Sequence, residues 1–333
     1  MPADLTPMTD GAYLDAYLQP LVPYLDRPEV TDLFINRPGE LWVETLGGEI
    51  ERHVEPTLDD AHLWRLARQV AARAHQGVSR AHPLLSATLP DGSRVQVIAP
   101  PATRGHLALA IRRHVVADLS LGDLQRSGVF DWVGRADGRR STRDADLQRL
   151  LAGGDTEAFL RAAVLDRRNI VVCGGTSTGK TTFANALISE IPRDERLIVI
   201  EDAPELQIHH PNAVGLVAVR GELGEAAVDV DDLLRASLRM RPDRIILGEL
   251  RGSEALTFAR AANTGHPGSI TTVHADSPAG GLSQMALMMV QADSNLTRDD
   301  SMSYVREVVD VWVQLRREAG RRLVTEILFE PRS

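Results

Sequence analysis

Residues 174–181 carry the side chains and the backbone freedom needed to hold a polyphosphate. They fit the pattern G-x-x-x-x-G-K-[ST] at every fixed position. The glycines let backbone N–H groups turn inward, Lys180 can reach the β- and γ-phosphates, and the Thr181 hydroxyl can ligate Mg²⁺. We therefore predict a nucleoside triphosphate site; the alternative is an ordinary Gly/Thr-rich loop. The predicted nucleotide-binding residues of this loop are Gly174, Gly175, Thr176, Ser177, Thr178, Gly179, Lys180, Thr181 and Thr182.

The two flanks of this segment support the prediction. An apolar run, Asn169–Cys173, precedes it and indicates a strand, and Thr182–Ile188 indicates the start of a helix. A strand, a glycine-rich turn and a helix form the context in which phosphate-binding loops occur. Cys173 lies inside the expected strand, so we expect a packed thiol rather than a reactive one.

A second chemical element follows the apolar strand expected at Leu197–Glu201. Glu201, Asp202 and Glu205 place three carboxylates at its end. The carboxyl ends of strands face the nucleotide in doubly wound folds, so these groups are candidates to position water or Mg²⁺. The alternative is a solvated acidic loop with a helix cap.

A third element is the apolar strand expected at Arg244–Gly248, which Glu249 follows. Gly248 stands where many NTPases place the Mg²⁺-directed aspartate, so Mg²⁺ would depend more on Thr181, phosphate oxygens and water. We predict that Glu249 orients or activates the attacking water; the alternative is a simple ion pair with Arg251. The predicted metal candidates are Thr181, Glu201 and Glu249, and Glu205 and Arg251 join the nucleotide-binding candidates.

A histidine ends a further strand expected at Ser269–Val273. His274 is a candidate to sense the γ-phosphate or to link it to a neighbouring subunit. The alternative is a hydrogen-bonded structural histidine.

Composition sets the class of protein. The 333 residues suffice for two domains, and the 43% hydrophobic and 25% charged contents are ordinary for a globular protein. The net charge of −9 argues against a nucleic-acid track, and we expect no direct sequence-specific nucleic-acid binding. We see no signal peptide and no apolar run approaching 18 residues, so we expect a cytoplasmic protein with peripheral membrane contact.

Three parts of the chain differ in pattern. We predict an N-terminal α/β domain (residues 1–114), a linker (115–161) and a second α/β domain (162–333). The basic run Arg135–Arg143 favours a solvated linker, since it lacks the interleaved aromatics of a nucleic-acid site. The first part contains a helix interrupted by prolines (Gly11–Leu25), a hairpin (Thr31–Asn36 and Glu40–Glu44), a helix (Asp59–Gln76) and strands at Ser86–Leu89, Arg94–Ile98 and Leu107–Arg112.

In the third part, strands and helices alternate as in a parallel sheet covered on both faces. Besides the strands already named, we expect one at Val214–Arg220. We also expect an antiparallel hairpin at the sheet edge, formed by Val308–Leu315 and Arg321–Phe329.

The phosphate loop, the Ile200–Leu206 acidic box, the Gly248–Gly252 element and the Thr271–Ala275 histidine box together resemble the secretion ATPase superfamily. The arginine-rich run Leu233–Arg244 also resembles it. The chain is most similar to the hexameric traffic ATPases of type IV secretion systems, the eleventh component of VirB-type machines. Segments 30–44, 86–98 and 109–113 match that group, and one cysteine cannot build the four-cysteine zinc element of type II and pilus motors.

This resemblance implies a C-terminal RecA-like P-loop ATPase domain, a smaller N-terminal α/β domain and a ring of six subunits with ATP and Mg²⁺ between the two domains. Arg94 and Arg112 match positions that supply arginines to the nucleotide phosphates, and Arg239 and Arg241 are candidates for contacts across a subunit boundary. The implied partners are other copies of the chain, inner-membrane components of a type IV secretion system, and a secreted protein or nucleoprotein.

Three other functions remain open at this stage. A pilus or type II secretion motor would have the same catalytic residues. A nucleotide-gated assembly scaffold would bind ATP with incidental hydrolysis. A DNA-translocating RecA relative would be stimulated by DNA in a strongly salt-dependent way.

Overall fold

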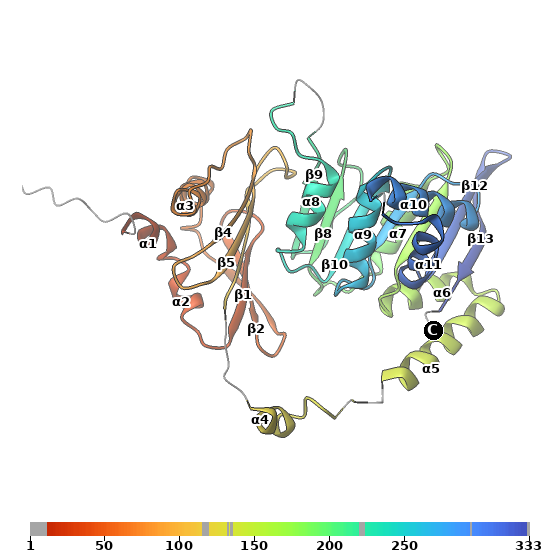
Figure 1. Ribbon diagram of the computed structural model, residues 1–333, viewed down its shortest axis with the longest axis horizontal. Helices are drawn as coiled ribbons and strands as arrows, with labels where there is room; N and C mark the ends of the chain where they lie inside the picture. The colour runs from red at the N-terminus through yellow and green to blue at the C-terminus, as the bar shows by residue number, and fades with distance from the viewer. Residues whose placement is uncertain are drawn as a thin grey trace, which may run out of the picture. The chain divides into compact units, whose positions relative to one another are not determined.

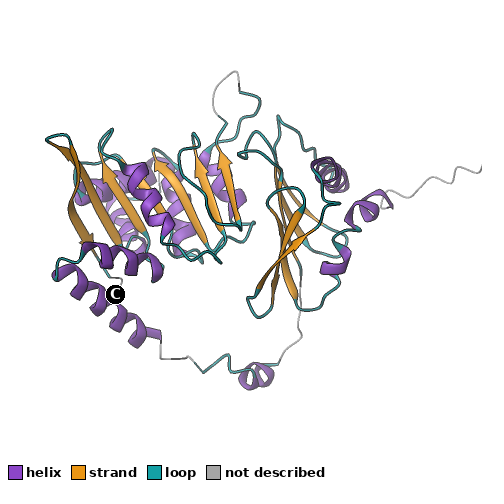
Figure 2. Cartoon of the chain, turned by 180° about the vertical axis from the view of Figure 1, so that it is seen from behind, coloured by secondary structure: helices purple, strands orange, loops and turns teal. Residues whose placement is uncertain are grey.

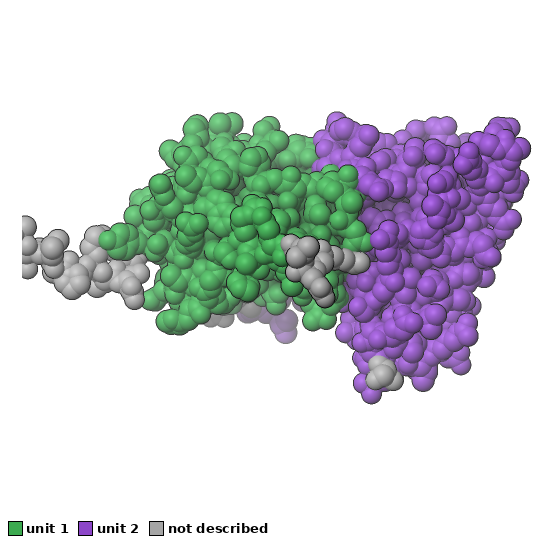
Figure 3. Space-filling view, turned by 90° about the horizontal axis from the view of Figure 1, so that it is seen from above, with its two compact units in different colours: residues 1–115, 196–204, 210–242 green, residues 116–195, 205–209, 243–333 purple. Residues whose placement is uncertain are grey.

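The chain forms two compact units in the computed structural model, which describes residues 12–114, 120–131, 133, 136–219, 224–293 and 295–331. Unit 1 comprises residues 1–115, 196–204 and 210–242, and unit 2 comprises residues 116–195, 205–209 and 243–333 (Figure 3). Two segments beyond residue 162 therefore group with the N-terminal unit, which no local sequence pattern indicated.

Unit 1 is built on a six-stranded antiparallel sheet with α1, α2 and α3 on one face (Figure 1). The predicted hairpin is confirmed, whereas β3 was not predicted. The strands in sheet order are β3 (Ile50–Val54), β2 (Glu40–Thr45), β1 (Val30–Ile35), β6 (Ala108–Arg112), β5 (Arg94–Ile98) and β4 (Leu84–Thr88); the helices are α1 (Ala12–Leu18), α2 (Val22–Leu25) and α3 (Asp60–Arg73).

The helix α3 shows how the sequence builds this unit. Asp59 caps it, accepting a hydrogen bond from the His62 backbone N–H at 2.6 Å. Its buried stripe is Leu63, Leu66, Ala67, Val70 and Ala71, at the spacing of one helix face. This stripe packs with the inward-facing residues of the sheet, such as Leu33 and Val97, into one core.

The predicted helix at Gly11–Leu25 is two helices in the structure. Leu18 and Leu21 join in a turn by a backbone hydrogen bond of 2.8 Å, and α1 and α2 lie on either side of it. Pro20 within the turn has no backbone N–H to continue a helix. Gly11 lies outside the described residues.

The opposite face of the six-stranded sheet carries a row of charges. Strand register places Glu44 beside Asp32, Asp32 beside Arg112, and Arg112 beside Arg94. The two acids are buried at the β2 and β1 end of the row, and Arg94 ends it on β5. This charged row lies on a sheet whose other face is the apolar core.

The second sheet has seven strands in the order β13-β12-β7-β11-β10-β8-β9. In unit 2, β12, β7, β11 and β10 pair in parallel, and β13 closes the edge as an antiparallel hairpin with β12, as predicted. The strands β8 and β9 belong to unit 1 and pair with each other in parallel. The bounds are β7 (Ile170–Gly174), β8 (Leu197–Glu201), β9 (Ala213–Val217), β10 (Arg244–Leu250), β11 (Ile270–Val273), β12 (Val311–Glu318) and β13 (Arg321–Phe329).

Helices lie on both faces of this sheet (Figure 2), which confirms the α/β fold class. Among the described residues, no helix is long and apolar enough to cross a bilayer. The helices that follow β6 along the described chain are α4 (Leu121–Arg126), α5 (Ala136–Ala152), α6 (Thr156–Leu165), α7 (Lys180–Ser189), α8 (Val230–Ser237), α9 (Glu254–Asn263), α10 (Pro278–Ala292) and α11 (Arg298–Val308).

Two predicted boundaries differ from the structure. The strand expected from Val308 begins at Val311, because Val308 still belongs to α11. The expected linker contains α5, which an ion pair of 2.5 Å between Asp144 and the buried Arg168 fastens to unit 2. Val115 at the start of the predicted linker, Arg135 at the start of the basic run within it, and Arg220 at the end of a predicted strand lie outside the described residues.

Candidate nucleotide-binding site

Two residues of the loop between β7 and α7 have backbone φ angles in the left-handed region. Gly179 (φ +95°) precedes the first turn of α7, and Ser177 has φ +62°. A side chain at Gly179 would also approach Arg322 Cδ to 2.9 Å. No side chain caps the N-terminus of α7, so this end of the helix offers backbone N–H groups and partial positive charge to an anion.

Lys180 curls over this loop. Its Nζ donates to Gly174 O at 3.0 Å and to Gly175 O at 3.3 Å, and its side chain is 9% exposed. The same Nζ lies 3.5 Å from Glu249 Oε1 and 3.4 Å from His274 Nε2. The lysine is thus held at the loop by weak, replaceable acceptors.

Glu249 lies at the centre of a small cluster of side chains. Its Oε1 is 3.0 Å from His274 Nε2, and its Oε2 accepts from Arg251 Nε at 2.5 Å. The ion pair with Arg251, weighed above as an alternative, therefore exists, but together with contacts to Lys180 and His274. These residues meet because β7, β11 and β10 are adjacent parallel strands whose carboxyl ends share one edge (Figure 1).

Thr181 and Glu205 form a second polar contact in unit 2. Thr181 Oγ1 donates to Glu205 Oε2 at 3.1 Å. Within the described part of the chain, no three His, Cys, Asp or Glu side chains gather as a ready metal cage. The hydroxyl and the carboxylate are hard oxygen ligands, the type that Mg²⁺ prefers.

Glu201 belongs to unit 1 and has a partner that the sequence did not indicate. It is 3% exposed, and Arg104 Nη2 donates to its Oε2. Asp202, the next residue, is half-buried. The predicted roles of Glu201 in Mg²⁺ binding and catalysis stay predictions, and Arg104 is a residue that sequence reasoning missed.

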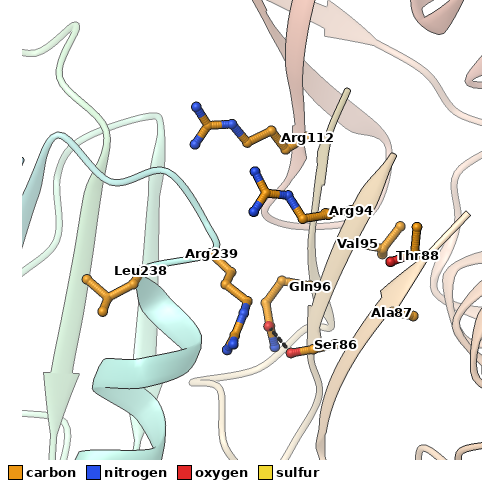
Figure 4. A pocket seen from close by; sticks show the side chains of 9 residues that line it. All are labelled: Ser86, Ala87, Thr88, Arg94, Val95, Gln96, Arg112, Leu238 and Arg239. Carbon is orange, nitrogen blue, oxygen red and sulfur yellow. Dashed lines mark hydrogen bonds between the residues drawn. The ribbon is translucent and has the colours of Figure 1, made fainter. Parts of the chain in front are cut away.

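Arg94 and Arg112 lie opposite each other on neighbouring strands of unit 1 and line a pocket of about 230 Å³ (Figure 4). Arg239 joins them, together with Ser86, Thr88 and Gln96 among the other lining residues. Asp32 Oδ1 is 3.9 Å from Arg112 Nε; burial raises the pKa of Asp32, and Arg112 opposes that rise. Three guanidinium-bearing side chains at one pocket make an anion-attracting site.

Arg241, named with Arg239 as a candidate for contacts across a subunit boundary, pairs with the buried Glu44 of its own chain; the contact across a boundary stays a prediction for both. Its backbone is in the left-handed region (φ +53°). The structure therefore separates the two arginines: Arg239 lines the pocket, and Arg241 neutralises a buried acid.

The expectation of a packed Cys173 thiol agrees with the structure. The residue is buried, and burial raises the pKa of its thiol to about 12. The helix α10 passes close above it at Gly281, where a side chain would come within 2.5 Å of the sulfur. Cys173 is thus a packing residue beneath the phosphate-binding loop.

These features define a class. A parallel α/β sheet with a phosphate-binding loop and Lys180, Glu249 and His274 at neighbouring strand ends is a P-loop ATPase. A family model described as "Type II/IV secretion system protein" matches residues 15–310. The chain belongs to this secretion ATPase family, within its VirB11 group of type IV secretion proteins, as the resemblance predicted.

The relatives support this membership along nearly the whole chain. VirB11 of Brucella suis is 39% identical over 332 residues, covering 96% of this chain and 91% of the relative. VirB11 of Bartonella henselae is 37% identical (94% and 92% covered), and PtlH of Bordetella pertussis is 38% identical (96% and 95% covered). The crystal structure of the Brucella suis VirB11 ATPase in complex with sulphate matches with a TM-score of 0.88 and 37% identity, covering 96% of this chain and 98% of that one.

Proposed function

We propose that this chain hydrolyses Mg²⁺–ATP in a ring of six subunits at the cytoplasmic face of the inner membrane and thereby powers a type IV secretion or conjugation apparatus. The observation that carries the proposal is the meeting of Lys180, Glu249 and His274 at the phosphate-binding loop.

Lys180 is suited to bind the β- and γ-phosphates. Its ammonium group now donates to two loop carbonyls, and phosphate oxygens would be stronger acceptors for the same protons. Its burial strengthens the electrostatic interaction with a phosphate relative to an exposed lysine. We therefore assign it to charge stabilisation in the loose transition state of phosphoryl transfer.

Glu249 is suited to orient the attacking water. A carboxylate held between Arg251 and His274 has a defined direction, and its 15% exposure leaves a route for water. His274, which is half exposed and bonded to Glu249, is placed to transmit the state of the γ-phosphate.

Thr181 and Glu205 fit Mg²⁺ through their oxygens, Thr181 directly and Glu205 as a partner of the Thr181 hydroxyl. Glu249 stays a second carboxylate candidate. The metal ion, when bound, neutralises charge on the β- and γ-phosphate oxygens.

The unit 1 arginines complete the proposal. Arg94 and Arg112 face a common pocket, and by family resemblance they supply positive charge to the nucleotide phosphates. The proposed partners are other copies of this chain, inner-membrane components of the secretion system, and the transported protein or nucleoprotein.

The test is Mg²⁺-dependent ATPase activity per subunit across a wide range of protein concentration, with Lys180→Ala as the blank and sedimentation to measure assembly. We expect activity per subunit to rise to a plateau as rings form. Full activity in a sedimenting monomer would overturn the ring, and activity equal to the blank in assembled protein would favour a nucleotide-gated scaffold.

A transport assay separates the motor from the scaffold. Glu249 is tied by three side chains, which a nucleotide-gated switch would also use. If Glu249→Gln supports transport while Lys180→Ala abolishes it, ATP binding alone drives the system and the motor is excluded. If both variants abolish transport, hydrolysis is required.

A further inference from the structure

The ion pair between Arg104 and Glu201 joins a buried carboxylate at a strand end to an arginine from a loop far away in the sequence. Glu201 is the last residue of β8, and its side chain is 3% exposed, whereas Arg104 comes from the loop before β6 and is 23% exposed. A carboxylate so little exposed needs a cation to remain ionised at low cost. Arg104 is the cation that the structure gives it.

The backbone fixes Arg104 independently of its side chain. The Arg104 N–H donates to Gly215 O at 2.9 Å, and the Val217 N–H donates to Ala102 O at 3.0 Å. Between them, Thr103 pairs with Leu216 in an isolated bridge. The loop is thus fastened to β9, the strand that pairs Val217 with Glu201.

The absence of a side chain at Gly215 leaves the space that the Arg104 side chain occupies. A Cβ at this position would lie 2.5 Å from Arg104 Cδ, 2.8 Å from Nε and 2.9 Å from Cγ. These are the middle atoms of the side chain, so the arginine lies directly on the bare glycine backbone. Any larger residue there must shift these atoms of Arg104.

We propose that Arg104 is a positioning residue for the ATPase reaction, which holds the Glu201 carboxylate ionised and in one orientation at the carboxyl end of β8, with Gly215 as the gap that admits it. This inference rests on the proposed function, since strand carboxyl ends are where nucleotides bind in such folds. Glu201 then acts as a hydrogen-bond acceptor of fixed orientation, whose negative charge Arg104 already neutralises. It does not act as a ligand that supplies a full negative charge to Mg²⁺.

The test measures kcat and KM for ATP in Arg104→Gln, Glu201→Gln and the double variant. We expect Arg104→Gln to lower kcat at least tenfold with KM changed less than threefold, because orientation rather than affinity is lost. Arg104→Lys should recover part of kcat. In the Glu201→Gln background, Arg104→Gln should have no further effect, since the arginine acts through that carboxylate.

Two further variants guard against a folding defect. Gly215→Ala keeps every charge and should lower kcat in the same direction as Arg104→Gln. Arg80→Ala removes another arginine–glutamate pair of unit 1, the exposed one with Glu225, and should leave kcat unchanged. Melting curves of all variants are compared with the wild type.

The outcomes separate this inference from the proposed function. If Lys180→Ala is inactive but Arg104→Gln and Gly215→Ala keep wild-type kcat, the inference fails and the function stands. If the effects of Arg104→Gln and Glu201→Gln add independently, Arg104 acts elsewhere and the inference also fails. If Lys180→Ala retains activity, the proposed function itself fails.

Discussion

An arginine–glutamate ion pair lies at each end of β10. The arginine is buried in the first pair and exposed in the second. At the start of β10, Arg244 is fully buried and donates to both oxygens of Glu195, at 2.6 and 2.8 Å, and to Val164 O at 2.8 Å. At its end, Arg251 is 56% exposed and its Nε donates to one oxygen of Glu249, whose other oxygen faces Lys180 and His274.

The difference indicates what each pair does. The buried pair is joined by two direct hydrogen bonds, and a third from Arg244 to a backbone carbonyl fixes the strand, at the risk of a large penalty if either partner is lost. The exposed pair contributes little to stability and leaves a carboxylate able to exchange partners. The pair at the start of β10 thus stabilises the fold, whereas the pair at its end belongs to the candidate site. Mutations can test this contrast.

The largest effect should be on catalysis at the exposed end. Glu249→Gln keeps the size of the side chain but removes the negative charge, so kcat should fall by about 10²–10⁴-fold, the usual contribution of a positioned base. The melting temperature should stay near that of the wild type. A steady-state ATPase assay with a calorimetric scan of the same sample measures both, and a large loss of stability would contradict the contrast.

Arg244→Ala should do the reverse. It leaves the Glu195 carboxylate buried without its main partner, which typically costs about 3–5 kcal/mol of unfolding free energy. Urea unfolding checks this value. Arg161→Ala, which removes an exposed pair with Glu190 in the same unit, is the matched control and should leave the transition unchanged. Equal transitions in the two variants would refute the structural role of Arg244.

Gly268→Ala tests the packing around the buried pair more gently. Gly268 has φ +84°, and a side chain there would lie 2.6 Å from Arg244 Nη1, so we expect a loss of about 1–3 kcal/mol. Gly265 also has a positive φ (+117°) but open space around it. Gly265→Ala therefore shows the backbone cost alone, and urea unfolding of both variants gives the part due to the close packing of Gly268 against Arg244 and the Arg167 backbone. No difference between them would mean that Arg244 yields freely.

The smallest effect should come from Arg251→Ala. Glu249 keeps its contacts to Lys180 and His274, so we expect kcat to fall less than tenfold and stability to stay unchanged. A loss as large as that of Glu249→Gln in the same ATPase assay would show that Arg251 itself takes part in the reaction.

The cluster in unit 2 could be predicted because the carboxyl ends of its strands can be recognised in the sequence. The strand β7 leads into the glycine-rich loop, β10 carries Glu249 next to its last residue, and His274 follows β11 directly; parallel strands bring such ends together. The sequence therefore predicts Lys180, Glu249 and His274 at one site, and their roles stay predictions.

The features that the sequence did not predict have no signal in their neighbouring residues. Arg104 lies in an irregular loop, 97 residues before Glu201, so nothing near it in the sequence points to its partner. The edge strand β3 is mostly polar, and charged side chains such as Arg52, 2.6 Å from Glu40, hold it to β2. The start of β12 was misplaced because apolar residues stand on both sides of Asp310, Val308 and Val309 before it and Val311 and Trp312 after it, so periodicity does not mark the boundary there.

The burial of Cys173 makes the protein convenient for thiol labelling. Because its only thiol is enclosed and protonated at neutral pH, the wild-type chain should resist maleimides and spin labels while folded. A cysteine introduced at an exposed position of either unit would then be the sole reactive site, and distances between labels could follow subunit assembly without first removing the native residue. The same buried thiol becomes a reporter of its own, since it reacts only when the sheet beneath the phosphate-binding loop opens.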